Sequence, residues 1–333
     1  MPDAQSAEII KKMPKTEAHL HMEGAIPYCM LRSLDPEKYS AEPESWRGGF
    51  RFSSFSEFDE ALLGMVLPWF NSPERYGEAA RAVLGDLFEK NVRYVETSFA
   101  SGVLQFLGVD GRATAEAIKC AAPEGMEVRV YMGIHHDGHT PEMEGVFADA
   151  LSWECLDGID LHGDETVPLG GWAREYWDAA RKAGKLTKAH AGELCGPGFV
   201  RRVIDELGVS QIEHGIRAAE DPALAASLAE SGVSLDVCPT SNVKLRAAPS
   251  YASHPLRALR EAGVLCTVNS DDPVIFGSDI LGEYGCLMDE MGFTLSECAE
   301  IACDGWRAAK VSEAGKREMI SSICELAGIS HEK

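Results

Sequence analysis

The stretch Ala18-His19-Leu20-His21-Met22-Glu23-Gly24 sets two histidines two residues apart, near the start of the chain. In a β-strand, alternate side chains share one face, so both imidazoles can point toward the same metal ion. Imidazole is the commonest protein ligand for zinc and related metals, but two nitrogens do not hold a divalent ion alone. If the pair binds a metal, the remaining ligands have to come from other parts of the chain.

Eight short segments further along have the composition of strands, rich in apolar residues and closely followed by turn-forming residues. They are residues 16–21, 92–99, 127–135, 158–163, 186–190, 211–214, 234–238 and 265–269. Amphipathic helical segments lie between them, among them residues 72–90, 172–183, 197–207 and 222–231. This alternation predicts parallel strands with helical crossovers, and eight such units predict a (β/α)8 TIM barrel.

The segment between the first two predicted strands, about residues 24–91, is longer than an ordinary barrel loop. Its piece 55–63 predicts an extra helix that covers the C-terminal mouth of the barrel. The chain has no G-x-G-x-x-G after its first strand and no P-loop, which argues against a dinucleotide-binding or NTPase protein. Because no linker or repeat interrupts the pattern, we expect residues 1–333 to form a single barrel domain.

The charge balance restricts the partners of the protein. The 53 acidic and 31 basic residues give a net charge of −22, which disfavours nucleic acids and anionic lipid surfaces. No apolar run approaches the roughly 20 residues needed to span a bilayer, and residues 1–12 lack the apolar centre of a secretory signal. The ten cysteines form no C-x-x-C pair, which is typical of reduced thiols in a cytoplasmic protein.

Metal-binding and acidic side chains occur where predicted strands end, which is where (β/α)8 barrels carry their active sites. The first strand ends in His19 and His21, the fifth in His190 and the sixth in His214, while Asp271 and Asp272 follow the eighth. A histidine at one strand end is more often an ordinary polar residue. Four strands that deliver such groups to the same rim favour a metal site.

Three imidazoles and one carboxylate, from His19, His21, His190 and Asp271, suit a zinc-like ion that also takes a water molecule. Such an ion lowers the pKa of its water toward neutrality. Glu193 follows His190 by three residues and can deliver a proton to the group under attack. His214 can orient or deprotonate the water, and Asp272 is free to accept a hydrogen bond from the substrate.

Several of these segments resemble motifs of the adenosine/adenine deaminase family, within the metal-dependent amidohydrolases. The likeness begins with residues 13–24, MPKTEAHLHMEG, and covers about residues 12–310 in order. It continues through 158–165, 190–193, 212–215, 238–242 and 270–273. It implies a zinc-dependent (β/α)8 hydrolase that removes ammonia from the 6-position of an aminopurine, an aminohydrolase of cyclic amidines.

The resemblance also implies a role for each site residue. By it, His19, His21, His190 and Asp271 bind one Zn²⁺ per chain, and Asp271 also receives the proton of the water. Glu193 would protonate purine N1 and His214 would position the attacking hydroxide. The backbone N–H of Gly163 would bind N3, and Asp272 would bind at N7. A single ion is expected because no lysine lies near the end of the fourth strand.

The chain departs from the family pattern where the outer half of a substrate would bind. Glu23 replaces the aspartate that reaches the ribose 5′-hydroxyl in adenosine-specific members, and a glutamate here is seen in adenine-specific relatives. His162 stands at a position that is usually small and apolar. The polar run from His135 to His139 is expected to be a solvated loop, the alternative being a contact to a substrate substituent.

Adenosine or deoxyadenosine, converted to inosine or deoxyinosine and ammonia, is the first substrate expected, with Glu23, Gly163 and Asp272 as its contacts. Free adenine and a 5′-modified adenosine such as aminodeoxyfutalosine are the alternatives. A different metal hydrolase and a non-catalytic binding protein are the competing classes, although no ligand is missing. The expected partner is a small aminopurine, not nucleic acid or a membrane, and assembly into a homo-oligomer stays open.

Overall fold

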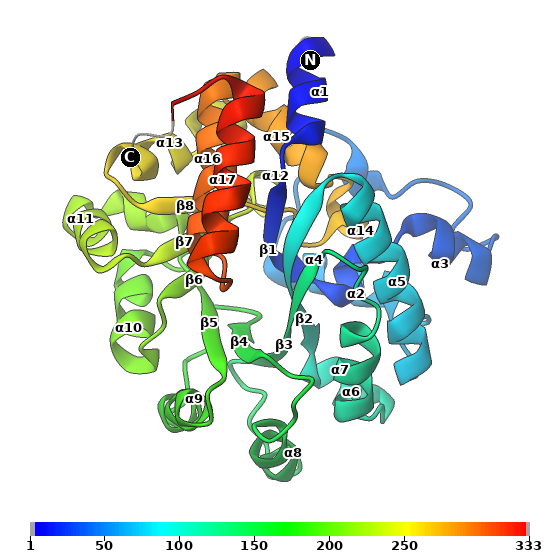
Figure 1. Ribbon diagram of the computed structural model, residues 1–333. Helices are drawn as coiled ribbons and strands as arrows, with labels where there is room; N and C mark the ends of the chain where they lie inside the picture. Colours follow the sequence, from blue (N-terminus) through cyan, green and yellow to red (C-terminus); the bar gives the residue numbers. More distant parts are fainter. Residues whose placement is uncertain (1–3, 331–333) are drawn as a thin grey trace.

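Eight parallel strands pair in chain order in the structure, a computed structural model that describes residues 4–330 (Figure 1). They are β1 (Lys15–His21), β2 (Val92–Ala100), β3 (Glu127–His135), β4 (Gly158–His162), β5 (Leu186–Ala191), β6 (Gln211–His214), β7 (Ser234–Val237) and β8 (Leu265–Val268). The predicted strands differ from these by at most one residue at either end. Residues 1–3 and 331–333 of the expected domain, and part of the N-terminal segment 1–12, lie outside the described residues.

The barrel closes between β1 and the segment after β8. Leu20 bridges Asp271 in parallel, His21 N donates to Asp271 O at 3.1 Å, and Asp271 N donates to His19 O at 3.1 Å. Ala18 N also donates to the side-chain oxygen of Asn269 at 2.7 Å. The (β/α)8 TIM-barrel prediction is therefore confirmed, and the closing seam passes through three predicted metal ligands.

Helices surround the barrel on the outside (Figure 1). Before β1 and between β1 and β2 they are α1 (Ala4–Lys12), α2 (Met22–Ala25), α3 (Tyr28–Leu34), η1 (Glu44–Trp46), α4 (Phe55–Val66) and α5 (Pro73–Glu89). From β2 to β7 they are α6 (Ser101–Leu107), α7 (Gly111–Lys119), α8 (Glu144–Ala150), α9 (Trp172–Lys182), α10 (Pro197–Leu207), η2 (Ile216–Glu220) and α11 (Pro222–Ser231). After β7 they are α12 (Pro239–Lys244), η3 (Tyr251–Ser253), α13 (Leu256–Glu261), α14 (Pro273–Phe276), α15 (Ile280–Asp289), α16 (Leu295–Ala308) and α17 (Glu313–Ala327).

Local chemistry explains where several of these helices begin. The Ser72 hydroxyl accepts from Arg75 N at the start of α5, and Pro73 occupies the first helical position. At the start of α16, Thr294 and Glu297 form a capping box, in which each side chain satisfies the other residue's backbone N–H. The start of α5 agrees with the helix predicted over residues 72–90.

Helix α4 lies over the mouth of the barrel, as the sequence predicts for residues 55–63. Its side chains Phe55, Phe58, Leu62 and Leu63 line the cavity at the C-terminal end of the strands. Phe58 stacks on Phe276 of α14 with ring centroids 5.3 Å apart, which holds the helix against the barrel. The long insertion thus provides a cover for the site.

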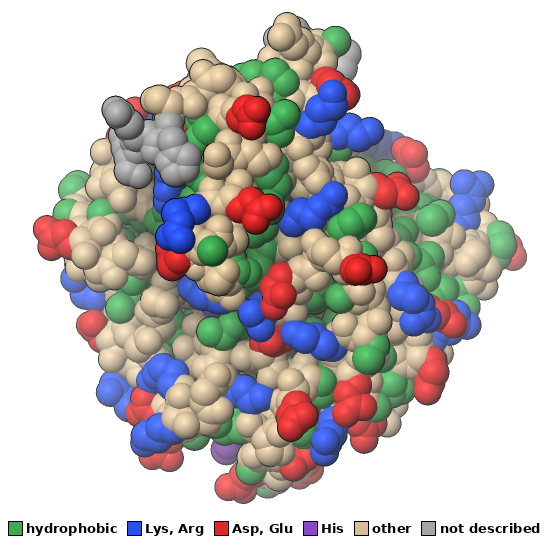
Figure 2. All heavy atoms as spheres, in the orientation of Figure 1, with side chains coloured by type: hydrophobic (Ala, Val, Ile, Leu, Met, Phe, Trp, Pro, Cys, Tyr) green, Lys and Arg blue, Asp and Glu red, His purple; other side chains and the backbone are tan. Residues whose placement is uncertain are grey.

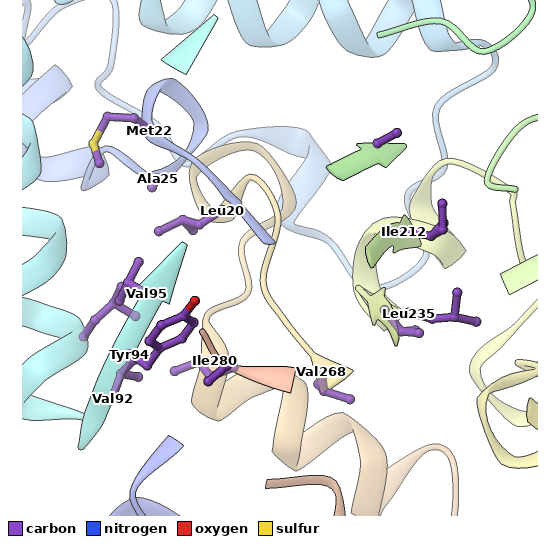
Figure 3. Packing of buried hydrophobic residues seen from close by; sticks show 14 of the residues in the cluster. Leu20, Met22, Ala25, Val92, Tyr94, Val95, Ile212, Leu235, Val268 and Ile280 are labelled. Atoms are coloured by element: carbon purple, nitrogen blue, oxygen red, sulfur yellow. The ribbon is translucent and has the colours of Figure 1, made fainter. Parts of the chain in front are cut away.

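Buried apolar side chains form one cluster between the barrel and its helices. Figure 3 shows part of it, in which Leu20, Val95 and Ile280 come from β1, β2 and α15. Burial of such side chains is the main favourable term in folding. The helical layer therefore supplies an apolar core outside the strands.

The inside of the barrel, in contrast, is polar below the site. Its buried side chains include Glu17, Glu96, Asp160, Lys188, Glu213 and Asp236, all at 0% exposure. Lys188 Nζ lies 2.7 Å from Glu213 Oε1 and 3.8 Å from Glu96 Oε2. Buried charges of this kind are tolerated only when they are paired, so this cation offsets part of the acidic interior.

One face of the molecule shows how charged side chains are distributed on its surface. Acidic and basic side chains are interspersed over the face drawn in Figure 2. Within residues 4–330, no helix combines the length and the apolar character needed to cross a bilayer.

Candidate active site

The predicted metal ligands lie together at the C-terminal mouth of the barrel. The ligand atoms of His19, His21 and His190 all lie within 4.8 Å of one another. His19 Nε2 lies 3.1 Å from His190 Nε2, and Asp271 Oδ1 lies 3.4 Å from His19 Nε2 and 3.2 Å from His21 Nε2. Three imidazole nitrogens and a carboxylate oxygen therefore converge on one point, a donor set that suits zinc.

The other ring nitrogen of each histidine contacts the protein. His19 Nδ1 lies 3.1 Å from Asp236 O, His21 Nδ1 lies 3.0 Å from Ser98 Oγ, and His190 Nδ1 lies 3.0 Å from Leu161 O. Such contacts fix the orientation of metal-binding imidazoles and direct their remaining nitrogen at the ion. The residues present therefore fit a metal ion.

Unusual backbone conformations place His214 and Asp271 in the site. His214 and Asp271 have φ angles of 64° and 63°, in the left-handed region that non-glycine residues seldom adopt. This breaks the alternation of the strand, so that Glu213 and His214 both reach the ligand cluster, as do Asp271 and Asp272. Strain of this kind is concentrated at functional sites.

Glu193 and His214 face each other beside the ligand cluster. Glu193 Oε2 lies 3.5 Å from His214 Nε2, which lies 3.9 Å from Asp271 Oδ2. Burial, together with the negative charge of Asp271, raises the pKa of Glu193 to about 8. Burial also lowers the pKa of His214 well below its usual range, with His19 acting in the same direction. The pair therefore favours a neutral acid beside a neutral imidazole.

Glu23, Gly24 and Asp272 form the adjoining wall. A methyl group placed on Gly24 would lie 1.6 Å from Asp272 Oδ1, so only glycine leaves room for this carboxylate. Glu23 Oε1 accepts hydrogen bonds from the Tyr76 hydroxyl at 2.6 Å and from Ala100 N at 3.0 Å. Burial raises the pKa of Glu23, and burial together with Asp271 raises that of Asp272.

A cavity of about 320 Å³ contains these groups. It is lined by seven predicted site residues with side-chain roles (His21, Glu23, His190, Glu193, His214, Asp271 and Asp272), by Gly163, and by apolar side chains of α4 and α6. Among the described residues that line it, none is a lysine or an arginine. A phosphate group would find no positive side chain there, which argues against nucleotide substrates.

The predicted solvated loop at residues 135–139 is wrong for its first two histidines. His135 lines the cavity together with His162 and Gly163. His136 is 2% exposed and its Nδ1 lies 2.9 Å from Val167 O. His139 is exposed and stacks on Trp172 with ring centroids 5.1 Å apart. His135 is half-buried and His136 is buried, so neither belongs to a solvated loop.

Sequence reasoning missed the residues that support the site. Glu165 accepts backbone hydrogen bonds from four consecutive residues, 192–195, at 2.7–3.2 Å, and so holds the loop that carries Glu193. Asn242 Nδ2 lies 3.0 Å from His214 Nδ1, and Glu213 Oε2 lies 2.9 Å from His190 Nδ1. The thiol of Cys238 lies near His19, His214 and Asp271. The alternation of side chains along a strand offered one signal, which concerned the polar interior of the barrel. Lys188 and Asp160 precede His190 and His162 by two residues, so they point to the same inward face.

Several known proteins are similar to this chain in sequence. The sequence model of the family described as adenosine deaminase matches residues 14–326. An adenine deaminase of Agrobacterium fabrum is 33% identical over 319 residues, covering 93% of this chain and 97% of that protein. An aminodeoxyfutalosine deaminase of Streptomyces coelicolor is 31% identical over 327 residues, covering 94% of this chain and 84% of that protein.

Solved structures share the fold. The crystal structure of an adenine deaminase from Arthrobacter aurescens superposes with a TM-score of 0.85 at 25% identity, covering 95% of this chain and 99% of that one. An amidohydrolase from Burkholderia ambifaria, solved with bound Zn, has a TM-score of 0.84 at 20% identity, covering 98% and 95%. The latter likeness shows the common barrel alone.

Proposed function

The chain belongs to the adenosine deaminase family, and from that premise we propose that it converts free adenine and water to hypoxanthine and ammonia, using one Zn²⁺ per chain. Deaminases of this family are metal-dependent hydrolases of adenine-type compounds, so the proposal concerns which compound and which metal. Adenosine, the first expectation from sequence, ranks below free adenine.

The engagement of Glu23 carries the choice of adenine. Its Oε1 accepts from the Tyr76 hydroxyl and from Ala100 N, so the protein itself fixes this carboxylate in the cavity wall and engages one of its two oxygens. Glu23 also extends one methylene further than the aspartate of adenosine-specific members. The names of the relatives from Agrobacterium fabrum and Arthrobacter aurescens support the same substrate.

His19, His21, His190 and Asp271 hold the ion in this proposal, and its charge makes a water molecule acidic enough to attack at neutral pH. Zinc is favoured over harder metals because three of the four donors are imidazole nitrogens. The Zn bound in the Burkholderia ambifaria amidohydrolase of the same fold is consistent with this choice.

Glu193 protonates purine N1 as water adds to C6. Protonation of N1 removes the cost of placing negative charge on the ring, so it stabilises the transition state more than the ground state. His214, 3.5 Å from Glu193 and 3.9 Å from Asp271, orients the attacking water, and Asp271 accepts its proton. The C6–N bond then breaks and ammonia leaves. Gly163 N–H binds N3, and Asp272 binds at N7.

A second candidate is a 5′-modified adenosine. The outer part of the cavity is apolar, with Phe55, Leu63, Val103 and Phe106 on α4 and α6, and Phe106 is 77% exposed at its rim. Such a surface can cover an apolar substituent beyond a ribose. The Streptomyces coelicolor relative named aminodeoxyfutalosine deaminase supports this alternative.

Ammonia release from a panel of aminopurines distinguishes these substrates. The zinc-loaded protein is expected to convert adenine with a kcat/KM at least about tenfold above that for adenosine, deoxyadenosine or 5′-modified adenosines. A higher kcat/KM for a 5′-modified adenosine would establish the second candidate. A higher value for adenosine would overturn the adenine assignment.

A further inference from the structure

His135 and His162 form a pair of imidazoles in the cavity that the proposed chemistry does not use. They end the neighbouring strands β3 and β4, pair in register, and pack edge to face with ring centroids 4.6 Å apart. Neither ring donates or accepts a hydrogen bond within the described part of the chain, and His162 Nε2 is buried without a partner. Polar groups buried in this way are costly unless a ligand satisfies them.

The backbone around this pair is shaped for it. A methyl group on Gly133 would lie 2.5 Å from His162 Cε1, so a glycine on β3 provides the space that the His162 ring fills. A methyl group on Gly163 would lie 3.1 Å from His135 Nδ1, and Gly163 has a φ of +91°. The His135 ring therefore lies directly beside the backbone of Gly163.

The environment keeps His135 neutral. Burial lowers its pKa, while Asp59 on the covering helix α4 opposes this shift through its negative charge. A neutral imidazole has one nitrogen that donates and one that accepts. His135 can thus offer an acceptor next to the N–H of Gly163.

Resting on the adenine deaminase function proposed above, we propose that His135, positioned by His162, accepts a hydrogen bond from N9–H of adenine. In free adenine the acceptor N3 and the donor N9–H are neighbours on one edge of the base. The His135 ring packs beside Gly163 and both line the cavity, so a base that receives Gly163 N–H at N3 can meet an acceptor nitrogen of His135 at N9–H. A nucleoside has no hydrogen at N9, so this contact selects the free base over its N9-substituted derivatives.

The test compares adenine with 9-methyladenine, which lacks N9–H but carries no sugar. The wild-type protein is expected to prefer adenine in kcat/KM. His135→Ala is expected to lower kcat/KM for adenine by about 10- to 100-fold, the discrimination typical of a lost substrate hydrogen bond. The same variant should change kcat/KM for 9-methyladenine by less than about threefold, so that the preference collapses.

Two further variants distinguish the loss of a substrate contact from a general loss of folding or of metal. His135→Asn keeps an acceptor near the position of Nδ1 and should recover part of the preference for adenine. His139→Ala alters an exposed histidine on the same segment that does not line the cavity, and should leave both substrates unaffected. Metal content and thermal midpoint of each variant show whether it is folded and loaded.

Equal losses for both substrates in folded, metal-loaded His135→Ala would overturn the role of His135 while leaving adenine deamination standing. Equal kcat/KM of the wild-type protein for adenine and 9-methyladenine would also overturn the role of His135 and leave adenine deamination standing. If the wild-type protein converts adenosine and not adenine, the proposed function itself fails, and the N9–H contact with it.

Discussion

At the scale of single residues, Glu193 is the group on which the proposed chemistry depends most. It lies outside the metal-binding set and faces His214 at 3.5 Å, and its carboxyl Oε1 is buried without a hydrogen-bond partner among residues 4–330. A carboxylic acid that lines the cavity with one oxygen free of partners is placed to give its proton to a bound base. Its loss should therefore affect turnover and leave metal binding intact.

Glu193→Gln tests this separation. The amide keeps the shape of the side chain and cannot act as an acid, so kcat should fall by about 10²- to 10⁴-fold. Metal content, measured on the purified variant, should equal that of the wild-type protein. Near-normal turnover would remove Glu193 from the proton transfer.

At the scale of elements, the site depends on contacts between loops from neighbouring strands. The loop after β5 carries Glu193, and the Glu165 carboxylate from the loop after β4 accepts its four successive N–H groups. A carboxylate that accepts several backbone N–H bonds fixes the loop that donates them. Glu165 is therefore a positioning residue that acts through Glu193.

Glu165→Ala should leave these donors without an acceptor and destabilise the protein by about 3 kcal/mol in denaturant unfolding. Turnover should fall mainly in kcat, because the acid moves while the purine-binding walls stay. Glu165→Gln keeps one acceptor oxygen and should show an intermediate loss of both quantities. If kcat in Glu165→Ala stays at the wild-type value, the loop does not need this anchor.

At the scale of the whole molecule, the ion and the barrel are expected to stabilise each other. The proposed ligands come from β1, β5 and the segment after β8, so a metal bound only by the folded chain links distant parts of the sequence. Binding of this kind stabilises the folded state by about 4 kcal/mol when the free metal concentration exceeds the Kd a thousandfold.

Metal analysis should find about one zinc per chain, and removal by a chelator should lower the thermal midpoint by several degrees, reversibly on adding zinc. Asp271→Ala should lose metal and activity together and should show no further drop with chelator. Two tightly held ions per chain would contradict the mononuclear site, and full zinc retention in Asp271→Ala would exclude this residue as a ligand.

The barrel and the convergence of the ligand residues could be predicted because both depend on short stretches of sequence. His19 and His21 share a strand face, and strand ends are marked by the turn residues that follow. The cover by α4 followed from the long insertion and its helical periodicity. These features can be predicted from local sequence, without knowing which loops come together in the folded chain.

What could not be predicted depends on distant segments coming together. Glu23 is held by Tyr76, 53 residues away, and nothing in the local sequence reveals that bond. His135 lines a cavity that α4, from a distant part of the sequence, also lines, whereas its polar neighbours in the sequence suggested a solvated loop. The opposing pKa shifts of Glu193 and His214 arise from a cavity that exists only in the folded barrel.

The closing seam sets an order of events for a chain that is still being synthesised. Asp271 joins β1 through its backbone and is the last of the proposed ligands in the sequence. A ribosome must therefore release more than four-fifths of the polypeptide before the first strand meets the partner that completes its metal site. Nascent chains and products of premature termination upstream of this point would carry His19 and His21 without Asp271, so the proposed four-ligand site cannot form in them.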